Sequence, residues 1–147
     1  TNDAPSAVVR LTEMGIEPFL VGSALDCVVA QRLARKLCER CKQPAEPSGE
    51  ELDRLGFPSV GPDGAPVRLF APVGCRQCSN TGYRGRIALH EVMAVSEEIE
   101  RLTVERASSA DIARVAKRQG MLTLRQDGFA KALRGYTSLE EILRVAV

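Results

Sequence analysis

The sequence predicts an α+β fold, with helices at the start, a loop-rich segment held by four cysteines in the middle, and about four helices at the C-terminal end. Three observations predict this order. Two Cys-x-x-Cys pairs enclose a segment rich in proline and glycine. An alternating apolar run follows the second pair and is typical of a strand. Helix-capping residues then recur through the last third of the chain.

Composition limits the classes of protein to consider. The chain has 147 residues, enough to bury a core, and its 44% hydrophobic content is ordinary for a globular domain. Its formal charge of +1 argues against a protein that coats nucleic acid, which needs a clear basic excess. We see no apolar run of about 18 residues, so no membrane span is expected, and no signal-peptide pattern is visible at the start of the sequence.

The first 37 residues combine two expected helices with an ambiguous segment. Residues 4–14 suit a helix, because Pro5 fits a first helical turn and Gly15 can end it. Residues 18–30 are almost wholly apolar, which predicts a buried helix. Residues 29–37 could continue that helix or form a strand. Cys27, alone in this stretch, is expected to pack as a small hydrophobic side chain.

The middle of the chain, residues 38–82, is expected to be a loop-rich insertion. One short helix fits at 50–55, where Ser48 and Glu51 have the spacing of a capping box. Residues 85–95 predict a strand that places Ile87, Leu89 and Glu91 on one face and Ala88, His90 and Val92 on the other. His90 is the single histidine, and we expect a surface or core role for it in place of metal binding.

Four capped helices are expected after residue 95. Ser96 can begin a helix that continues to residue 106, and Ser108 with Asp111 can begin another that Gly120 ends. The next helix would follow a capping-box pair at Thr123 and Gln126 and end at Gly135. The last would begin at the pair Thr137 and Glu140.

The four paired cysteines, Cys38, Cys41, Cys75 and Cys78, predict a structural zinc site. A Cys-x-x-Cys turn presents two thiolates together, and two such turns complete the tetrahedral shell of Zn²⁺. Because all four ligands come from the protein, no position remains for a catalytic water. Two unrelated reduced pairs, a redox dithiol and an iron centre remain alternatives. A zinc ion with four thiolates carries a net charge of −2, which nearby cations would offset: Arg35, Lys36, Arg40, Lys42, Arg76 and Arg84.

The residues alone indicate no catalytic apparatus. The sequence has no G-x-x-x-x-G-K-[ST] phosphate loop, no G-x-G-x-x-G turn and no H-E-x-x-H motif. A free-standing zinc-ribbon-like module that binds a protein or nucleic acid through its basic flanks is therefore one hypothesis.

A second hypothesis comes from resemblance. Many short words of the sequence, in order, resemble the C-terminal part of the secretion ATPase superfamily, in particular the assembly ATPases of type II secretion and type IV pili. The matching words are Thr1–Ala4, Arg10–Leu11, Met14–Gly15, Glu17–Phe19, Ala30–Leu33, Leu37–Cys38, Cys41, Gly74–Cys75, Cys78, Thr81–Tyr83, Gly85–Arg86, His90–Glu91, Gly120–Met121, Leu124–Arg125, Asp127–Gly128, Gly135, Thr137–Glu141 and Arg144–Val145.

The resemblance implies a piece of a hexameric cytoplasmic motor that uses ATP and Mg²⁺ to assemble a pilus or pseudopilus, bound at the inner membrane through a platform protein. Residues 1–37 would end a RecA-like ATPase core, 38–82 would form the zinc insertion, 83–95 would return as a core strand, and 96–147 would form a C-terminal helical subdomain. The phosphate loop of the family lies upstream, so the full-length protein would be the enzyme and this piece alone would not.

The resemblance also implies two sets of site residues. Thr1 and Asn2 match the end of a His-Thr-Asn box close to the γ-phosphate, and Gln31 and Arg32 match a word near the nucleotide. We further expect the basic charge at Arg40 and Lys42 to face the platform protein, because clustered cations attract acidic surfaces.

Overall fold

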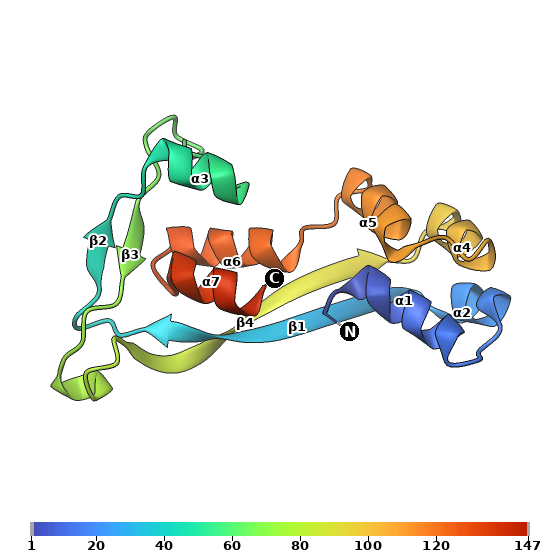
Figure 1. Cartoon of the computed structure of the whole chain (residues 1–147), viewed down its shortest axis with the longest axis horizontal. Coiled ribbons are helices and arrows are strands. Elements are labelled where there is room, and N and C mark those ends of the chain that lie inside the picture. Colours follow the sequence, from blue (N-terminus) through green and yellow to red (C-terminus); the bar gives the residue numbers. More distant parts are fainter. Residues whose placement is uncertain (1, 147) are drawn as a thin grey trace. The chain divides into compact units, whose positions relative to one another are not determined.

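A computed structural model describes residues 2–146, which contain both helices and strands (Figure 1). The α-helices in this range are α1 (Ala4–Glu13), α2 (Pro18–Ala24), α3 (Gly49–Leu55), α4 (Glu97–Val104), α5 (Ser109–Arg118), α6 (Leu124–Leu133) and α7 (Leu139–Val145). The strands are β1 (Cys27–Leu37), β2 (Gln43–Ala45), β3 (Leu69–Ala71) and β4 (Tyr83–Ala94), and a short 3-10 helix, η1, spans Arg76–Cys78. None of the described helices is both long and apolar enough to cross a bilayer.

The chain divides into two compact units. The first unit contains residues up to 31 together with 90–124, and the second contains 32–89 together with the residues from 125 onward. The expected C-terminal helices are therefore shared, because α4 and α5 belong to the first unit whereas nearly all of α6 and all of α7 belong to the second.

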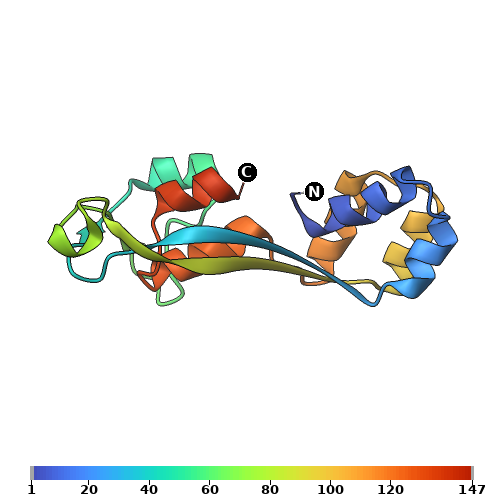
Figure 2. The same ribbon diagram turned by 90° about the horizontal axis from the view of Figure 1, so that it is seen from below.

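Strands β1 and β4 are hydrogen-bonded neighbours and contribute residues to both units. Figures 1 and 2 show them side by side and running in opposite directions. Residues 29–37 thus form a strand, and the helix expected over 18–30 ends at Ala24. Leu25 already has extended backbone angles, φ −91° and ψ 124°. The physical reason is that this segment pairs with β4, which is distant in sequence, and the β-branched pair Val28 and Val29 suits the paired strand.

Cys27 is exposed, which contradicts the prediction that it packs as a small hydrophobic residue. It is the first residue of β1, and side chains along β1 alternate between more and less exposed positions. Cys27 falls on the more exposed side of this alternation, together with Val29 and Leu33. The apolar residues beside Cys27 in the sequence therefore do not imply that Cys27 itself is buried.

The core of the first unit joins helices from both ends of the sequence to β4. Val8 of α1, Ile99 of α4 and Ile112 of α5 are buried, and they belong to one apolar cluster with Met93 of β4. Within β4, Leu89, Glu91 and Met93 are buried while His90 and Val92 are exposed, so the predicted alternation is confirmed over residues 89–92; Ile87 and Ala88 are both half-buried.

Glu91 is a buried carboxylate in the first unit. It accepts hydrogen bonds from the backbone N–H of Ala4 at 2.8 Å and of Leu124 at 3.0 Å. These donors are the first residues of α1 and α6, whose opening N–H groups have no partner within their own helices. A negative charge at a helix N-terminus is also favoured by the helix dipole, so Glu91 stabilises two helix starts.

The second unit contains a small antiparallel pair, β2 with β3, in which Pro44 lies opposite Phe70. Helix α3 begins after Ser48, whose side chain accepts from the N–H of Glu51, as the capping spacing predicted. Beyond α3, Phe57 stacks on Phe129 of α6 with ring centroids 4.6 Å apart. The insertion therefore packs on the C-terminal helices through aromatic contact.

The last helix begins one residue later than expected. Ser138, not Thr137, is the N-cap of α7, and its hydroxyl accepts from the N–H of Glu141. The Thr137 hydroxyl instead donates to the carbonyl of Arg35 in β1 at 2.9 Å. The Thr137 side chain, which the sequence pattern assigned to the helix cap, thus makes a tertiary hydrogen bond with β1.

Candidate metal centre

The hydrogen-bonded pair β1 and β4 brings the two cysteine pairs together, although 33 residues separate Cys41 from Cys75. The first knuckle, Cys38–Cys41, follows β1 directly, and the N–H of Lys42 closes it by donating to the carbonyl of Cys38 at 3.1 Å. The second knuckle, Cys75–Cys78, contains η1 and precedes β4. The N–H of Cys38 donates to the carbonyl of Gly82 at 3.0 Å and links the two knuckle loops.

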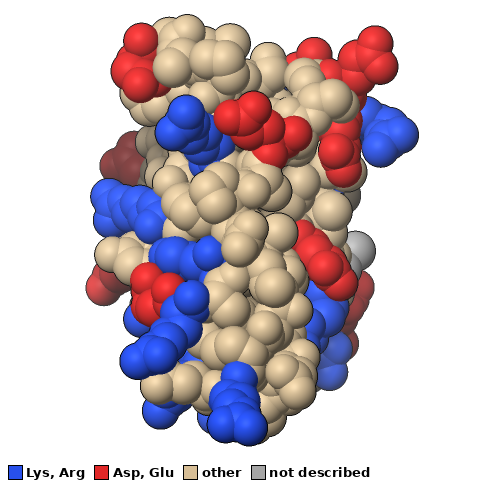
Figure 3. Space-filling view, turned by 90° about the vertical axis from the view of Figure 1, so that its left-hand side faces the viewer, with Lys and Arg blue, Asp and Glu red and all other residues tan. Residues whose placement is uncertain are grey.

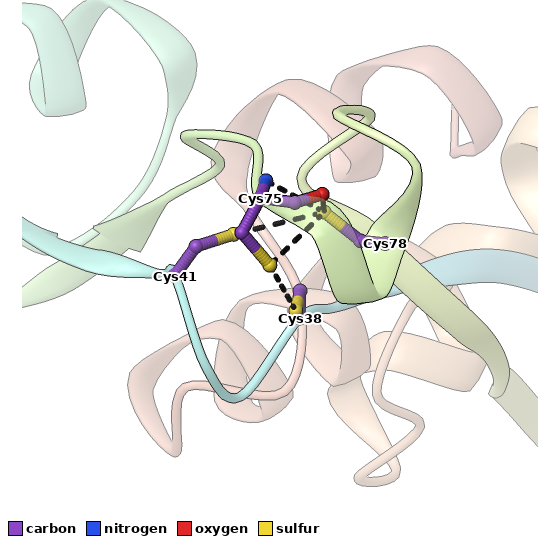
Figure 4. Close-up of side chains that lie close together, drawn as sticks. All are labelled: Cys38, Cys41, Cys75 and Cys78. Carbon is purple, nitrogen blue, oxygen red and sulfur yellow. Dashed lines mark hydrogen bonds between the residues drawn. The ribbon is translucent and has the colours of Figure 1, made fainter.

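The four cysteine sulfurs converge on one point (Figure 4), and all lie within 4.8 Å of one another. The Sγ–Sγ distances are 3.7 Å from Cys38 to Cys75, 3.8 Å from Cys41 to Cys78, and 3.7 Å from Cys75 to Cys78. A tetrahedral zinc with Zn–S bonds of about 2.3 Å places its sulfurs about 3.8 Å apart. The donor set and its spacing therefore fit a four-thiolate zinc ion.

Backbone N–H groups point at the sulfurs. Gly74 donates to Cys41 Sγ at 3.3 Å, while Cys75 and Gly82 each donate to Cys78 Sγ at 3.2 Å. Such bonds favour the thiolate, which is the form that binds metal. Gly74 and Gly82 were not singled out from the sequence as part of the site. Their signal is that each glycine lies within a few residues of a cysteine pair.

The pKa values of two thiols follow from these contacts. Burial opposes ionisation of Cys78, but the N–H groups of Cys75 and Gly82, together with the neighbouring thiols of Cys75 and Cys41, outweigh it and lower the pKa of Cys78 to about 6. For Cys41, the N–H of Gly74 favours the thiolate, yet burial and the neighbouring thiols together raise its pKa to about 11. Cys78 thus offers a thiolate near neutral pH, whereas Cys41 needs a cation beside it to ionise.

Gly82 occupies a position that other residues would not tolerate. Its φ of +81° lies in the left-handed region, and a Cβ added there would lie 2.4 Å from Cβ of Pro72. The same residue donates its N–H to Cys78 Sγ and accepts from Cys38 N. The close approach of Pro72, which precedes the second knuckle, to the residue before β4 therefore depends on the missing side chain.

Cations flank the sulfurs, but they are not equivalent. Arg35 pairs with Glu141 at 2.7 Å, and Lys42 pairs with Glu39 at 3.0 Å with its side chain only 17% exposed. Arg40 and Arg84 are exposed. They line a cavity of about 280 Å³, which we call the basic groove, together with Lys36, Leu37, Cys38, Glu39 and Gln77. Figure 3 shows Lys and Arg predominating over the lower part of the face seen there.

The residues expected near a nucleotide are not adjacent to the cysteine pairs in sequence, and they differ from one another in exposure. Thr1 lies outside the described residues, and Asn2 is exposed. Gln31 is exposed on β1, whereas Arg32 is half-buried, and neighbouring residues of a strand face opposite sides. His90 lies in the first unit, whereas the four cysteines all lie in the second.

Comparison with known proteins identifies the family. Residues 1–144 match the family model described as Type II/IV secretion system protein. The chain belongs to this family. Among curated members, it is 48% identical to the type IV pilus assembly ATPase PilB of Thermus thermophilus over 143 residues, which cover 97% of this chain and 16% of that protein.

Two further members of the Type II/IV secretion system protein family give the same picture. PilB of Myxococcus xanthus is 46% identical over 97% of the chain and 25% of its own length. The type II secretion system protein E of Aeromonas hydrophila is 41% identical over 99% of the chain and 28% of its own length. The chain thus spans between about a sixth and somewhat over a quarter of these relatives, which occur in both kinds of machine.

Proposed function

We propose that this chain is the zinc-bearing C-terminal part of a hexameric ATPase that drives assembly of a type IV pilus or a type II secretion pseudopilus. The match to named assembly ATPases over nearly the whole chain supports this proposal. In the full-length protein, residues 1–37 and 83–95 would complete a RecA-like core, 38–82 would be the zinc insertion, and 96–147 the helical subdomain. The free-standing module is not favoured, because the relatives named above are components of pilus and secretion machines.

The convergence of four sulfurs at zinc spacing carries the proposal of a structural zinc centre formed by Cys38, Cys41, Cys75 and Cys78. The ion would fix two loops that are otherwise joined by few hydrogen bonds, and it would leave no coordination site for a substrate. We expect about one zinc per chain in protein purified without added metal.

Metal analysis of variants tests this centre. Cys75→Ser should lower the zinc content sharply, because three thiolates hold the ion far less tightly than four. The matched control is Cys27→Ser, which removes an exposed cysteine outside the cluster and should leave the zinc content unchanged. A folded wild-type chain with no bound zinc would refute the centre.

For ATP and Mg²⁺, the contribution of this part would be secondary. The phosphate loop would come from elsewhere in the full-length protein, and Thr1, Asn2, Gln31 and Arg32 would lie near the nucleotide. Because Gln31 and Arg32 face opposite sides of β1, we propose that they serve different roles there. Replacing each by Ala in the full-length ATPase and measuring KM and kcat separately would distinguish a binding role from a catalytic one.

We propose that the assembly works at the cytoplasmic face of the inner membrane through a platform protein, and that the basic groove is the docking surface. Lys42 is unsuited to this role because it is mostly buried and paired. Arg40 and Arg84 are exposed at the groove and replace it as the contact residues. Their cationic groups would attract acidic side chains of the partner.

Co-purification with the platform protein tests this surface. Arg40→Glu with Arg84→Glu in the full-length ATPase should weaken co-purification, measured on protein whose zinc content has been shown to match that of wild type. Arg68→Glu is the control, because Arg68 is exposed in the same unit but lies outside the groove. Equal co-purification of wild type, the double variant and Arg68→Glu would exclude the groove as the docking site.

A further inference from the structure

The turn between α6 and α7 is attached to the backbone and side chains that flank the cysteines. The carbonyl of Gly135 accepts from Lys42 Nζ at 3.0 Å, and the carbonyl of Tyr136 accepts from the N–H of Leu37 at 2.9 Å. Leu37 directly precedes Cys38, and Lys42 directly follows Cys41. The two donors therefore bracket the first knuckle.

The next two residues of the turn continue this pattern. The Thr137 hydroxyl donates to the carbonyl of Arg35 at 2.9 Å, and the Ser138 hydroxyl lies 2.8 Å from the hydroxyl of Tyr83. Each of the four residues from 135 to 138 thus hydrogen-bonds to the end of β1, to the residue that follows the first knuckle, or to the start of β4. We call residues 135–138 the docked turn.

Among the contacts to the docked turn, the one from Lys42 uses a charged side chain next to Cys41. The Lys42 ammonium lies 5.0 Å from the ring centroid of Phe70 and 3.0 Å from a carboxylate oxygen of Glu39. Gly135 has φ +80°, and a Cβ added there would lie 2.9 Å from Lys42 Nζ. The turn therefore approaches Lys42 closely at a residue that only glycine suits well.

We propose that metal binding by the four cysteines and the seating of the docked turn are thermodynamically coupled, with Lys42 as the positioning residue. This inference rests on the zinc centre proposed above. A bound ion fixes the first knuckle, and hence the directions of the Leu37 N–H and the Lys42 side chain. Loss of the ion frees the knuckle and weakens both bonds to the turn.

The coupling is partial, because α7 has a second attachment. Glu141 accepts from the backbone N–H of Arg35 at 2.7 Å and from its guanidinium, farther from the knuckle. Without zinc, α7 should therefore remain folded, but it should detach transiently from its neighbours more often. Opening of this kind is measured by amide hydrogen exchange.

Hydrogen exchange of the 147-residue chain, with zinc and after removal of zinc by a chelator, tests the coupling. We expect exchange in residues 135–145 to become about ten-fold faster without zinc, which corresponds to the loss of one charge-assisted hydrogen bond. Exchange in α1 and α5, which belong to the first unit, should stay unchanged. Lys42→Met should already show faster exchange with zinc bound, and chelation should then add a smaller increase than in wild type, because only the bond from Leu37 N–H to Tyr136 remains to be weakened.

Linkage requires the reverse effect as well, because coupling between two sites is reciprocal. Competition with a chromophoric chelator should show weaker zinc binding by Lys42→Met than by Arg40→Met. Both variants remove one positive charge from the knuckle region, but only Lys42 contacts the turn. Equal affinities, or unchanged exchange in residues 135–145 while the zinc content falls to zero, would overturn the coupling and leave the zinc centre intact. A wild-type chain that binds no zinc would overturn both.

Discussion

Glu141 is a fully buried carboxylate that binds two arginines at once. Its oxygens accept from the side chains of Arg35 and Arg144 at 2.7–2.9 Å, and from the backbone N–H of Arg35 at 2.7 Å. Burial alone would raise its pKa, but the hydrogen bonds from Arg144 and Arg35 outweigh burial and lower the pKa to about 2. A carboxylate with a lowered pKa stabilises the folded state at every pH above its ordinary range.

Replacing Glu141 by Gln should reveal this contribution as a function of pH. We expect Glu141→Gln to lower the free energy of unfolding by about 2 kcal/mol at pH 7, because a buried set of charge-assisted hydrogen bonds is broken. The difference from wild type should shrink as the pH falls from about 4.5, the ordinary value, towards about 2, where the folded carboxylate is protonated.

Urea unfolding at a series of pH values measures this difference, with Glu140→Gln as the control. Glu140 is the exposed neighbour in the same helix turn, so its replacement should change stability little at any pH. A pH-independent deficit in Glu141→Gln would show that the side chain acts through packing and not through its charge.

At the scale of elements, the loop that carries the second knuckle is shaped by the start of β4. Gly82 and Gly85 both have φ above +80°, so an alanine at either position has the same unfavourable backbone. Only Gly82 also faces a close neighbour, Pro72, while an added Cβ at Gly85 meets no atom within 4 Å. A comparison of alanine variants at these two glycines therefore separates the cost of the backbone conformation from the cost of steric overlap.

We expect Gly82→Ala to weaken zinc retention strongly and Gly85→Ala to leave it near the wild-type level. The overlap with Pro72 would displace the N–H that Gly82 donates to Cys78 and the carbonyl that accepts from Cys38. Zinc content after dialysis against a weak chelator measures the effect. Similar losses in both variants would mean that the backbone conformation, and not the contact with Pro72, decides the outcome.

Local signals predicted the elements that local physics determines. The caps at Ser48, Ser96 and Ser108 were predicted because a capping hydrogen bond spans only three residues. The helix expected over 18–30 was wrong in its second half, because pairing of β1 with β4 depends on residues about 60 positions away. The convergence of the cysteines was predicted from their spacing, whereas the N–H donors at Gly74 and Gly82 depend on loop geometry that a single sequence does not specify.

At the scale of the whole molecule, the two compact units have different chemistry. The second unit contains the four sulfurs, the basic groove and the Glu141 network, while the first unit contains a mostly apolar core with the buried Glu91. The sequence contains no phosphate loop, in which backbone N–H groups and a Lys surround the β- and γ-phosphates. In the full-length ATPase proposed above, the phosphate loop would come from outside these 147 residues.

We expect the 147-residue chain alone to show no saturable ATP binding and no ATP hydrolysis. Isothermal titration with ATP and Mg²⁺, together with a phosphate-release assay, measures both quantities. Full-length PilB of Myxococcus xanthus serves as the positive control, since this relative is an assembly ATPase. Turnover by the purified chain that disappears in Arg32→Ala would show that the chain itself contains a nucleotide site.

The four cysteines differ in exposure, so reagents in solution should reach two of their sulfurs before the other two. Cys38 and Cys78 are buried, whereas Cys41 and Cys75, one from each knuckle, are partly exposed. Electrophiles and competing thiols should therefore reach the centre first through Cys41 and Cys75. In the zinc-bound protein, where all four sulfurs would be thiolates and exposure alone would distinguish them, brief alkylation followed by peptide mass spectrometry should label these two ahead of Cys38 and Cys78, with the exposed Cys27 as an internal standard for unhindered reaction. Oxidative damage would then begin at Cys41 and Cys75, while the buried sulfurs of Cys38 and Cys78 would be oxidised last.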